Sequence, residues 1–272
     1  MSLKVTLQRI VWIAFAVVVL RFVLQWGIAA GLPLPKISTI VYTLIFTLFS
    51  TFHASSVYGW RKGVIFLLIC AAVSWCYEEA GVATGLVYGH YHYGSMLGPK
   101  LGEVPLLIPL AWFMMVYPSW IIAHVLMQGS GDPTSLPGGI CRALIASTVM
   151  TSWDVVMDPS NAQAGLWTWE EGGPYFGVPF RNFFGWMLTT STVYIIMMFV
   201  CRRAETSSQH PDQQKLYMAL PVILYGFVAF DKAFLATLPE LHIVAVFGMC
   251  FISVLALFRL LLTRNPISLP PA

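Results

Sequence analysis

Apolar segments, each about long enough to cross a lipid bilayer, follow one another along the whole chain of 272 residues. A spanning helix needs roughly 20 predominantly apolar residues. Polar stretches with glycine and proline separate the segments and provide turns. No internal repeat interrupts the pattern, so we expect one integral membrane domain over residues 1–272. The fold class is therefore an all-α, polytopic membrane helical bundle of about eight spans: 10–31, 37–57, 62–80, 104–128, 138–158, 183–201, 216–237 and 240–262.

Composition supports the bilayer as the solvent of this chain. Hydrophobic residues make up 58% of the sequence and charged residues only 10%, whereas a soluble domain carries about 25% charged residues. The net charge of +3 comes without a basic run, so nucleic acid is excluded as a partner. The basic, apolar N-terminus is similar to a signal peptide. Its apolar stretch continues past Arg21 to Ala30, and we expect a retained first helix.

Positive charges are unevenly distributed between the two sets of connectors, which predicts the orientation. With both termini inside the cell, ten Lys and Arg residues lie on the inner face and four on the outer face. The inner set is Lys4, Arg9, Arg61, Lys62, Arg142, Arg202, Arg203, Lys215, Arg259 and Arg264; the outer set is Lys36, Lys100, Arg181 and Lys232. The long connectors 81–103 and 159–182 then lie outside a bacterial or archaeal cell membrane.

Two adjacent carboxylates, Glu78 and Glu79, close the third apolar segment. Neighbouring residues on a helix project about 100° apart, so one of the two faces the bundle interior. Acids at a membrane boundary are costly unless they are paired or functional. The simpler alternative is that both mark the end of the span in water. The stretch TGLVYGHYHYG follows and contributes Tyr88, Tyr91 and Tyr93.

A second acidic pair, Asp154 and Asp158, closes the fifth segment. The spacing i, i+4 places both on one helical face, and Pro159 is expected to end the helix there. Asp154 follows a long apolar run, where desolvation favours the protonated acid. Such an acid can donate a proton to a weak base. In the structural alternative, Asp154 pairs with Arg21 or another buried cation and holds the bundle together.

Aromatic residues are dense in the connector GLWTWEEGGPYFGVPFRNFFGW, which covers residues 165–186. Aromatic ring faces stabilise a cation and suit an apolar polyene. The alternative is an interfacial aromatic belt. The candidate substrate-binding residues of this and the preceding segments are Trp153, Tyr88, Tyr91, Tyr93, Trp167, Trp169, Tyr175, Asn182 and Trp186.

Metal chemistry has weak support in the sequence. His90 and His92 are two residues apart and could bind a metal together with the carboxylates. The repeated histidine clusters of membrane desaturases are missing. Asp154 and Asp158 have a spacing that suits a magnesium-bound diphosphate, but the longer Asn/Asp clusters of membrane prenyltransferases are also missing. We therefore predict no metal.

Two long motifs carry a resemblance to a known family. The segments EEAGVATGLVYGHYHYGSMLGPKLGEVPLLIPLAWFMM and SWDVVMDPSNAQAGLWTWEEGGPYFGVPFRNFFGW resemble the CruF-type carotenoid hydratase family of membrane proteins, over roughly residues 75–190. The resemblance implies addition of water to the terminal double bond of a carotenoid end group, which gives a tertiary alcohol. It also implies acyclic or monocyclic carotenes, or C50 bacterioruberin precursors, as substrates.

The resemblance and the residues suggest one mechanism. Asp154 or Asp158 protonates the alkene, aromatic rings hold the tertiary cation, and water near Glu78 or Glu79 captures it. No cofactor is expected, because the reaction involves neither a redox change nor loss of diphosphate. Two alternatives stay open: a cyclase that uses the same protonation, and a small transporter or lipid-binding protein.

Overall fold

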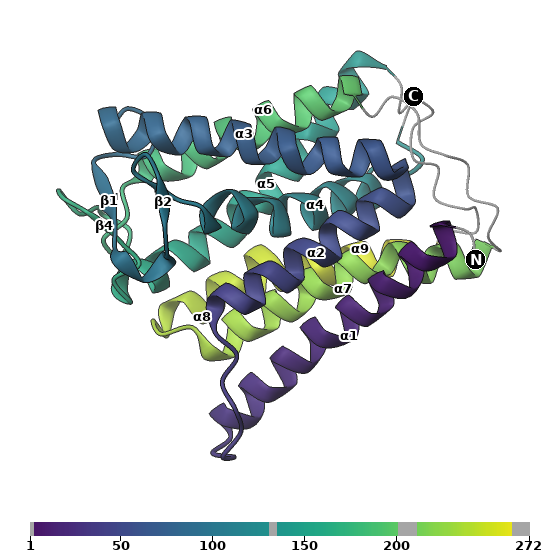
Figure 1. Cartoon of the computed structure of the whole chain (residues 1–272), viewed down its shortest axis with the longest axis horizontal. Helices are drawn as coiled ribbons and strands as arrows, with labels where there is room; N and C mark the ends of the chain where they lie inside the picture. Colours follow the sequence, from purple (N-terminus) through teal and green to yellow (C-terminus); the bar gives the residue numbers. More distant parts are fainter. Residues whose placement is uncertain (1–2, 131–134, 201–210, 263–272) are drawn as a thin grey trace.

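The computed structural model confirms the all-α polytopic bundle, whose helices pack side by side (Figure 1). In the part of the chain that the structure describes, eight helical segments are long and apolar enough to span a membrane. The structure describes residues 3–130, 135–200 and 211–262. The eighth segment contains a π-helical stretch between two α-helices. The elements of the spans are α1 (Leu3–Ala29), α2 (Thr39–Tyr58), α3 (Trp60–Thr84), α4 (Leu107–Leu126), α5 (Leu136–Gln163), α6 (Phe180–Val200), α7 (Pro211–Leu235), α8 (Glu240–Ala245), η2 (Val246–Cys250) and α9 (Phe251–Leu262).

Helix α4 lies at the centre of the bundle and packs against α2, α3, α5 and α7. In its most apolar window 89% of the residues are buried, whereas the corresponding window of α1 is only 22% buried. Helix α1 lies at the edge of the bundle (Figure 1) and exposes large apolar side chains such as Trp12, Ile13 and Leu20. An apolar outer surface of this kind is stable in lipid, where it needs no polar cover.

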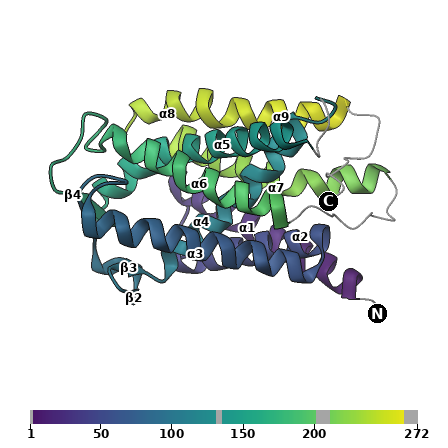
Figure 2. The ribbon, with the colours of Figure 1, turned by 90° about the horizontal axis from the view of Figure 1, so that it is seen from above.

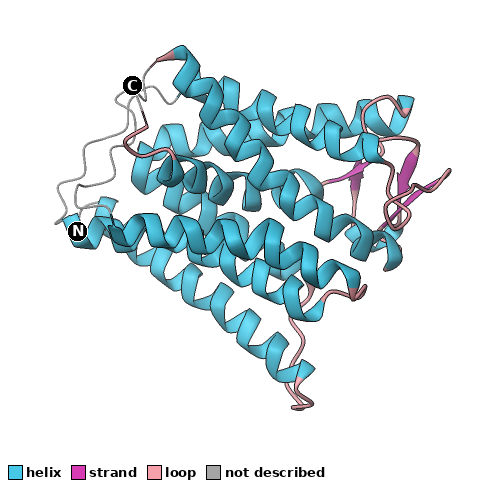
Figure 3. Cartoon of the chain, turned by 180° about the vertical axis from the view of Figure 1, so that it is seen from behind, coloured by secondary structure: helices cyan, strands magenta, loops and turns pink. Residues whose placement is uncertain are grey.

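The long connectors fold over one end of the bundle and form two small antiparallel sheets (Figure 3). One pairs β1 (Tyr91–Tyr93) with β4 (Trp167–Trp169), and the other pairs β2 (Lys100–Leu101) with β3 (Val104–Pro105). A 3-10 turn, η1 (Ser95–Leu97), lies between β1 and β2. These strands were not predicted, because three alternating residues are too few to give a clear signal. Their period of two nevertheless turns aromatic side chains inward and His92 and Thr168 outward.

Helix α5 differs from the prediction at its C-terminal end. Pro159 does not end the helix, which continues to Gln163 with the proline inside it. The expectation was wrong because a proline removes only one i to i−4 hydrogen bond, and this one falls in the last turns. The next residue continues the turn, and the Ser160 hydroxyl donates to the Val156 carbonyl oxygen at 3.3 Å.

The first and the last helix have their terminal ends on the same side of the bundle, as an even number of spans requires. Helix α1 begins and α9 ends at the end of the bundle opposite the small sheets (Figure 2). Which face is outside stays a prediction from the charge count. Three of the predicted inner-face charges, Arg202, Arg203 and Arg264, lie outside the described residues.

Candidate active site

A cavity of about 200 Å³ lies beneath the β1–β4 sheet, between the ends of α3 and α5 and the starts of α4 and α6. Pockets for drug-sized ligands usually measure about 300–1,000 Å³, so this cavity suits an end group rather than a whole polyene. Of the site residues predicted from the sequence, it brings together Glu78, Tyr88, Tyr91, Tyr93, Trp153, Asp158, Trp167, Trp169, Asn182 and Trp186.

Glu78 is buried in the last turns of α3 and accepts hydrogen bonds from three side chains. The hydroxyl groups of Tyr91 and Tyr93 donate to its Oε2 atom, Tyr93 at 2.7 Å. The indole of Trp112 donates to Oε1 at 2.9 Å. Burial and the nearby charge of Glu78 raise the pKa of Tyr91 and Tyr93 well above its usual value, so both phenols keep the protons that they donate.

A pair of carboxyl groups occupies a second wall of the cavity. Asp154 and Asp158 lie one turn apart on the same face of α5, and both carboxyl groups are buried; two buried carboxyl groups this close together cannot readily both ionise. The side-chain amide of Asn182, from α6, donates to Asp158 Oδ2 at 2.6 Å and to Asp154 Oδ2 at 3.2 Å. Asp158 lines the cavity, whereas Asp154 is fully buried behind it.

Aromatic rings close the space between the two acidic walls. Trp112 stacks on Trp186 with ring centroids 3.9 Å apart, and Trp153 meets Trp186 edge-on at 5.9 Å. On the side of the sheet, Tyr91 lies 6.0 Å from Trp169. Ring faces carry partial negative charge, so such an enclosure favours a cation over a neutral molecule.

Trp112 is a site residue that the sequence analysis missed. It lies in the apolar segment LLIPLAWFMM, where a tryptophan is indistinguishable from an ordinary core residue. Only its position on α4, facing Glu78 of α3, reveals its function as a hydrogen-bond donor. Asn182, in contrast, was predicted as a substrate contact, and the structure shows it clamping the carboxyl pair.

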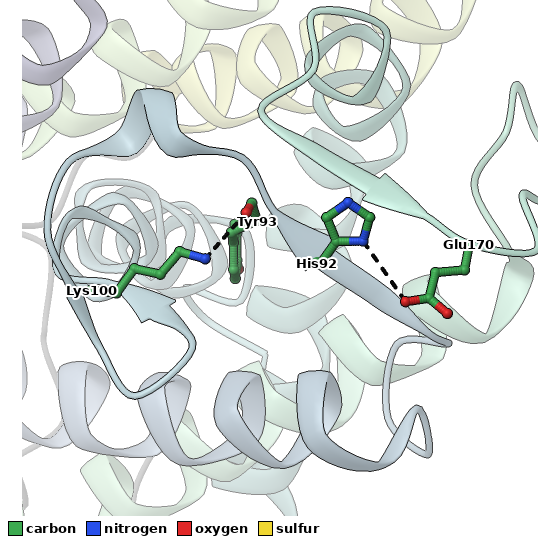
Figure 4. Close-up of polar contacts among 4 residues, drawn as sticks. All are labelled: His92, Tyr93, Lys100 and Glu170. Carbon is green, nitrogen blue, oxygen red and sulfur yellow. Dashed lines mark hydrogen bonds and ion pairs between the residues drawn. The ribbon is translucent and has the colours of Figure 1, made fainter.

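The β1–β4 sheet is held in place from both sides. Gly85 ends α3 in the left-handed conformation, with φ 67°, and turns the chain towards the sheet. At the edge of β1, the Lys100 ammonium group donates to the Tyr93 carbonyl oxygen at 3.2 Å (Figure 4). On the exposed side, His92 lies 3.8 Å from Glu170, which directly follows β4 (Figure 4).

Two predicted residues besides Asp154 do not line the cavity. Glu79 points away from it, and its Oε2 atom accepts the backbone N–H of Glu103 at 2.9 Å. Tyr175 lies in the connector before α6, and both burial and the nearby Asp154 raise its pKa. The structure therefore separates the adjacent glutamates into one acid inside the cavity and one that holds the β2–β3 turn.

A second polar group lies at the far end of the same cavity, among α1, α2 and α7. The Arg21 guanidinium lies over the ring of Tyr42, 4.4 Å from its centroid, and Asp231 accepts a hydrogen bond from Trp26 at 3.2 Å. Asp154 accepts from Asn182 at the other end of the cavity, so the alternative pairing of Asp154 with Arg21 is wrong.

The histidine-based metal alternative finds no support in the geometry. Over residues 3–130, 135–200 and 211–262, no group of three or more His, Cys, Asp or Glu side chains is arranged to hold a metal ion. His92 faces Glu170 on the exposed side of the sheet, away from the carboxyl groups of the cavity.

The sequence matches the family described as carotenoid biosynthesis protein over residues 38–255. This range includes every residue of the acidic and aromatic walls described above. The chain belongs to this carotenoid biosynthesis family. The match extends beyond the segments that carry the resemblance, and it confirms the CruF-type assignment made from the sequence motifs.

One curated relative of this carotenoid biosynthesis protein is the bisanhydrobacterioruberin hydratase of Haloarcula japonica. The two are 30% identical over 145 residues, which represent 53% of this chain and 47% of the relative. The chain thus matches about half the length of that protein. No solved structure matches the chain.

Proposed function

We propose that this protein adds water to the terminal C=C bond of a carotenoid end group by acid catalysis through a tertiary carbocation. The observation that carries the proposal is a buried carboxyl pair that shares one amide donor, and a separate, triply hydrogen-bonded carboxyl group, on two walls of one aromatic cavity. The family and the name of the Haloarcula relative support a carotenoid substrate and a hydration.

The carboxyl pair supplies the proton. Asp158 lines the cavity and is the acid in this proposal, while Asp154, buried behind it on the same amide donor, is close enough to keep the pair from ionising twice. Asn182 fixes both carboxyl groups in position. The O–H bond of the acid breaks, and the alkene π pair forms a C–H bond at the less substituted carbon. The remaining positive charge resides on the tertiary carbon.

Glu78 and the aromatic walls then act on the cation. Glu78 is the carboxylate in this step: three side-chain donors hold its two oxygen atoms in place, and a charge held in advance stabilises the charge that develops opposite it. A lone pair of water forms the C–O bond, and the surplus proton of that water passes to a carboxylate. The product is a tertiary alcohol. The sequence of steps consumes one water and requires no redox partner.

Expression in cells that accumulate lycopene tests the proposed function. Hydration predicts a product whose mass has increased by one water for each modified end. An unchanged mass with a ring in the product would instead assign the protein as a cyclase. If the lycopene, and other acyclic carotenoids supplied in the same way, are recovered unchanged, the proposed function is wrong.

Substitution of Glu79 by Gln is expected to leave the yield of alcohol within about twofold of that of the unmodified protein. The Glu79 side chain accepts a backbone N–H outside the cavity, and glutamine retains an acceptor oxygen for that bond. Product yield should be measured at matched protein levels. A loss of hydration at an unchanged protein level would show that Glu79 takes part in the reaction.

A further inference from the structure

Two hollows lie on opposite sides of strand β4. Trp167 and Trp169 line the inner cavity and also line an outer groove of about 370 Å³. The end of α5 continues the same partition, since Asp158 faces the inner cavity while Pro159 lines the outer groove. The acid of the proposed reaction is therefore separated from the groove by the thickness of one strand and one helical turn.

The outer groove belongs to the polar end of the molecule. Apart from the end of α5, its lining comes from connectors between the spans, including Thr168, Gly172 and Gly177. Thr168 and Gln163 are exposed there. Other walls of the inner cavity come from spanning helices, such as α4 with Trp112. Only strand β4 and the end of α5 thus separate the reaction cavity from the polar end of the molecule.

Polar atoms without partners lie next to this partition. The Oδ1 atom of Asp154 and the hydroxyl group of Tyr175 are both buried and have no hydrogen-bond partner among the residues that the structure describes. Tyr175 directly precedes Phe176 and Gly177, which line the outer groove. Buried polar atoms of this kind are commonly satisfied by bound water. A water bound between the two residues would lie beside the carboxyl pair.

We infer that the outer groove is the vestibule from which water reaches the reaction cavity, and that Trp167 and Trp169 form the barrier that limits its entry. This inference rests on the proposed hydration and adds a determinant of its outcome. With water admitted, the cation forms a C–O bond and becomes an alcohol. Without water, a neighbouring C–H bond gives its proton to a carboxylate, its electron pair re-forms the alkene, and no net reaction occurs.

Filling the groove separates protonation from hydration. Ala162 and Thr168 line the groove but not the inner cavity. We expect Ala162→Phe, and independently Thr168→Trp, to reduce the alcohol yield at least tenfold in membranes supplied with lycopene in D2O. The membranes are equilibrated with D2O before lycopene is added, so the acid already carries deuterium. Recovered lycopene should still gain up to one deuterium per protein, because the acid protonates the alkene and the cation returns to it. Mass spectrometry of both fractions measures the two processes.

Ala164→Phe is the matched control, since Ala164 is exposed near the same end of α5 and lines neither hollow. It should form alcohol at the rate of the unmodified protein. Unchanged hydration in both groove variants overturns the inference, and so does an equal loss of alcohol and deuterium uptake in both. If the unmodified protein gives neither alcohol nor deuterium uptake, it is the proposed function that fails.

Discussion

Substitution of Asp158 by Asn should reduce alcohol formation by about 10²–10⁴-fold, the usual contribution of a general acid. The amide keeps the size and the buried position of the side chain but has no acidic proton to transfer to an alkene. Asp158 is the member of the pair that lines the cavity. The measurement is the fraction of carotenoid converted, at equal protein level, in membranes supplied with an acyclic carotene.

Asp154→Asn is the informative comparison for this variant. Asp154 is fully buried behind Asp158 and does not line the cavity, so its substitution should reduce the rate less than that of Asp158. Deuterium uptake into recovered substrate should decline together with alcohol in both variants, because both affect protonation. Full activity of Asp158→Asn would contradict the assignment of the acid. Loss of protein from the membrane alone would indicate a structural role.

Substitution of Glu78 by Gln should reduce the rate by about 10²–10³-fold, as expected when a group that stabilises developing charge is removed. Glutamine is neutral and therefore no longer attracts the cation. In the unmodified protein, Tyr91, Tyr93 and Trp112 donate hydrogen bonds to the Glu78 carboxylate. In the variant, the amide N–H groups of the glutamine would face these donors. Both alcohol formation and the thermal midpoint of the purified protein should decrease.

Tyr93→Phe distinguishes the loss of the Glu78 charge from the disruption of its hydrogen bonds. It removes one donor to Glu78 Oε2 but leaves the carboxylate and two further donors in place. A hydrogen bond to a charged group contributes about 1.5–3 kcal/mol, which corresponds to a factor of about 10 to 160 in rate, so the rate should decrease less than in Glu78→Gln. An activity of Glu78→Gln equal to that of Tyr93→Phe would exclude Glu78 as the principal stabiliser of the cation.

The helices could be predicted from the sequence because a bilayer imposes a length on every span. The predicted segment 37–57 and helix α2 at Thr39–Tyr58 nearly coincide, since both follow from the apolar stretch alone. Pro159 was misread because the local rule for proline does not consider the remaining bonds of the last turns. The three-residue strands have no periodicity long enough to detect.

The sequence predicted those site residues whose polarity is unusual for an apolar segment, and it did not predict those that resemble ordinary core residues. Acids at the ends of apolar segments are conspicuous, so Glu78 and Asp158 stood out. The sequence could not decide between Glu78 and Glu79, because the choice depends on the rotation of α3 against α4. Trp112 gave no signal because one indole among apolar residues is ordinary. Its hydrogen bond to Glu78 depends on how α4 packs against α3 and therefore cannot be inferred from the sequence.

The size of the inner cavity, about 200 Å³, has a consequence for the kinetics of a substrate with two reactive ends. A cavity that binds one end of the carotenoid makes no contact with the other end, so the reaction does not depend on whether that end is already hydrated. The two ends of a symmetric carotenoid would then react as independent events, separated by release into the lipid. The singly modified compound should accumulate first, and the doubly modified one should follow in the proportion that two uncoupled reactions dictate.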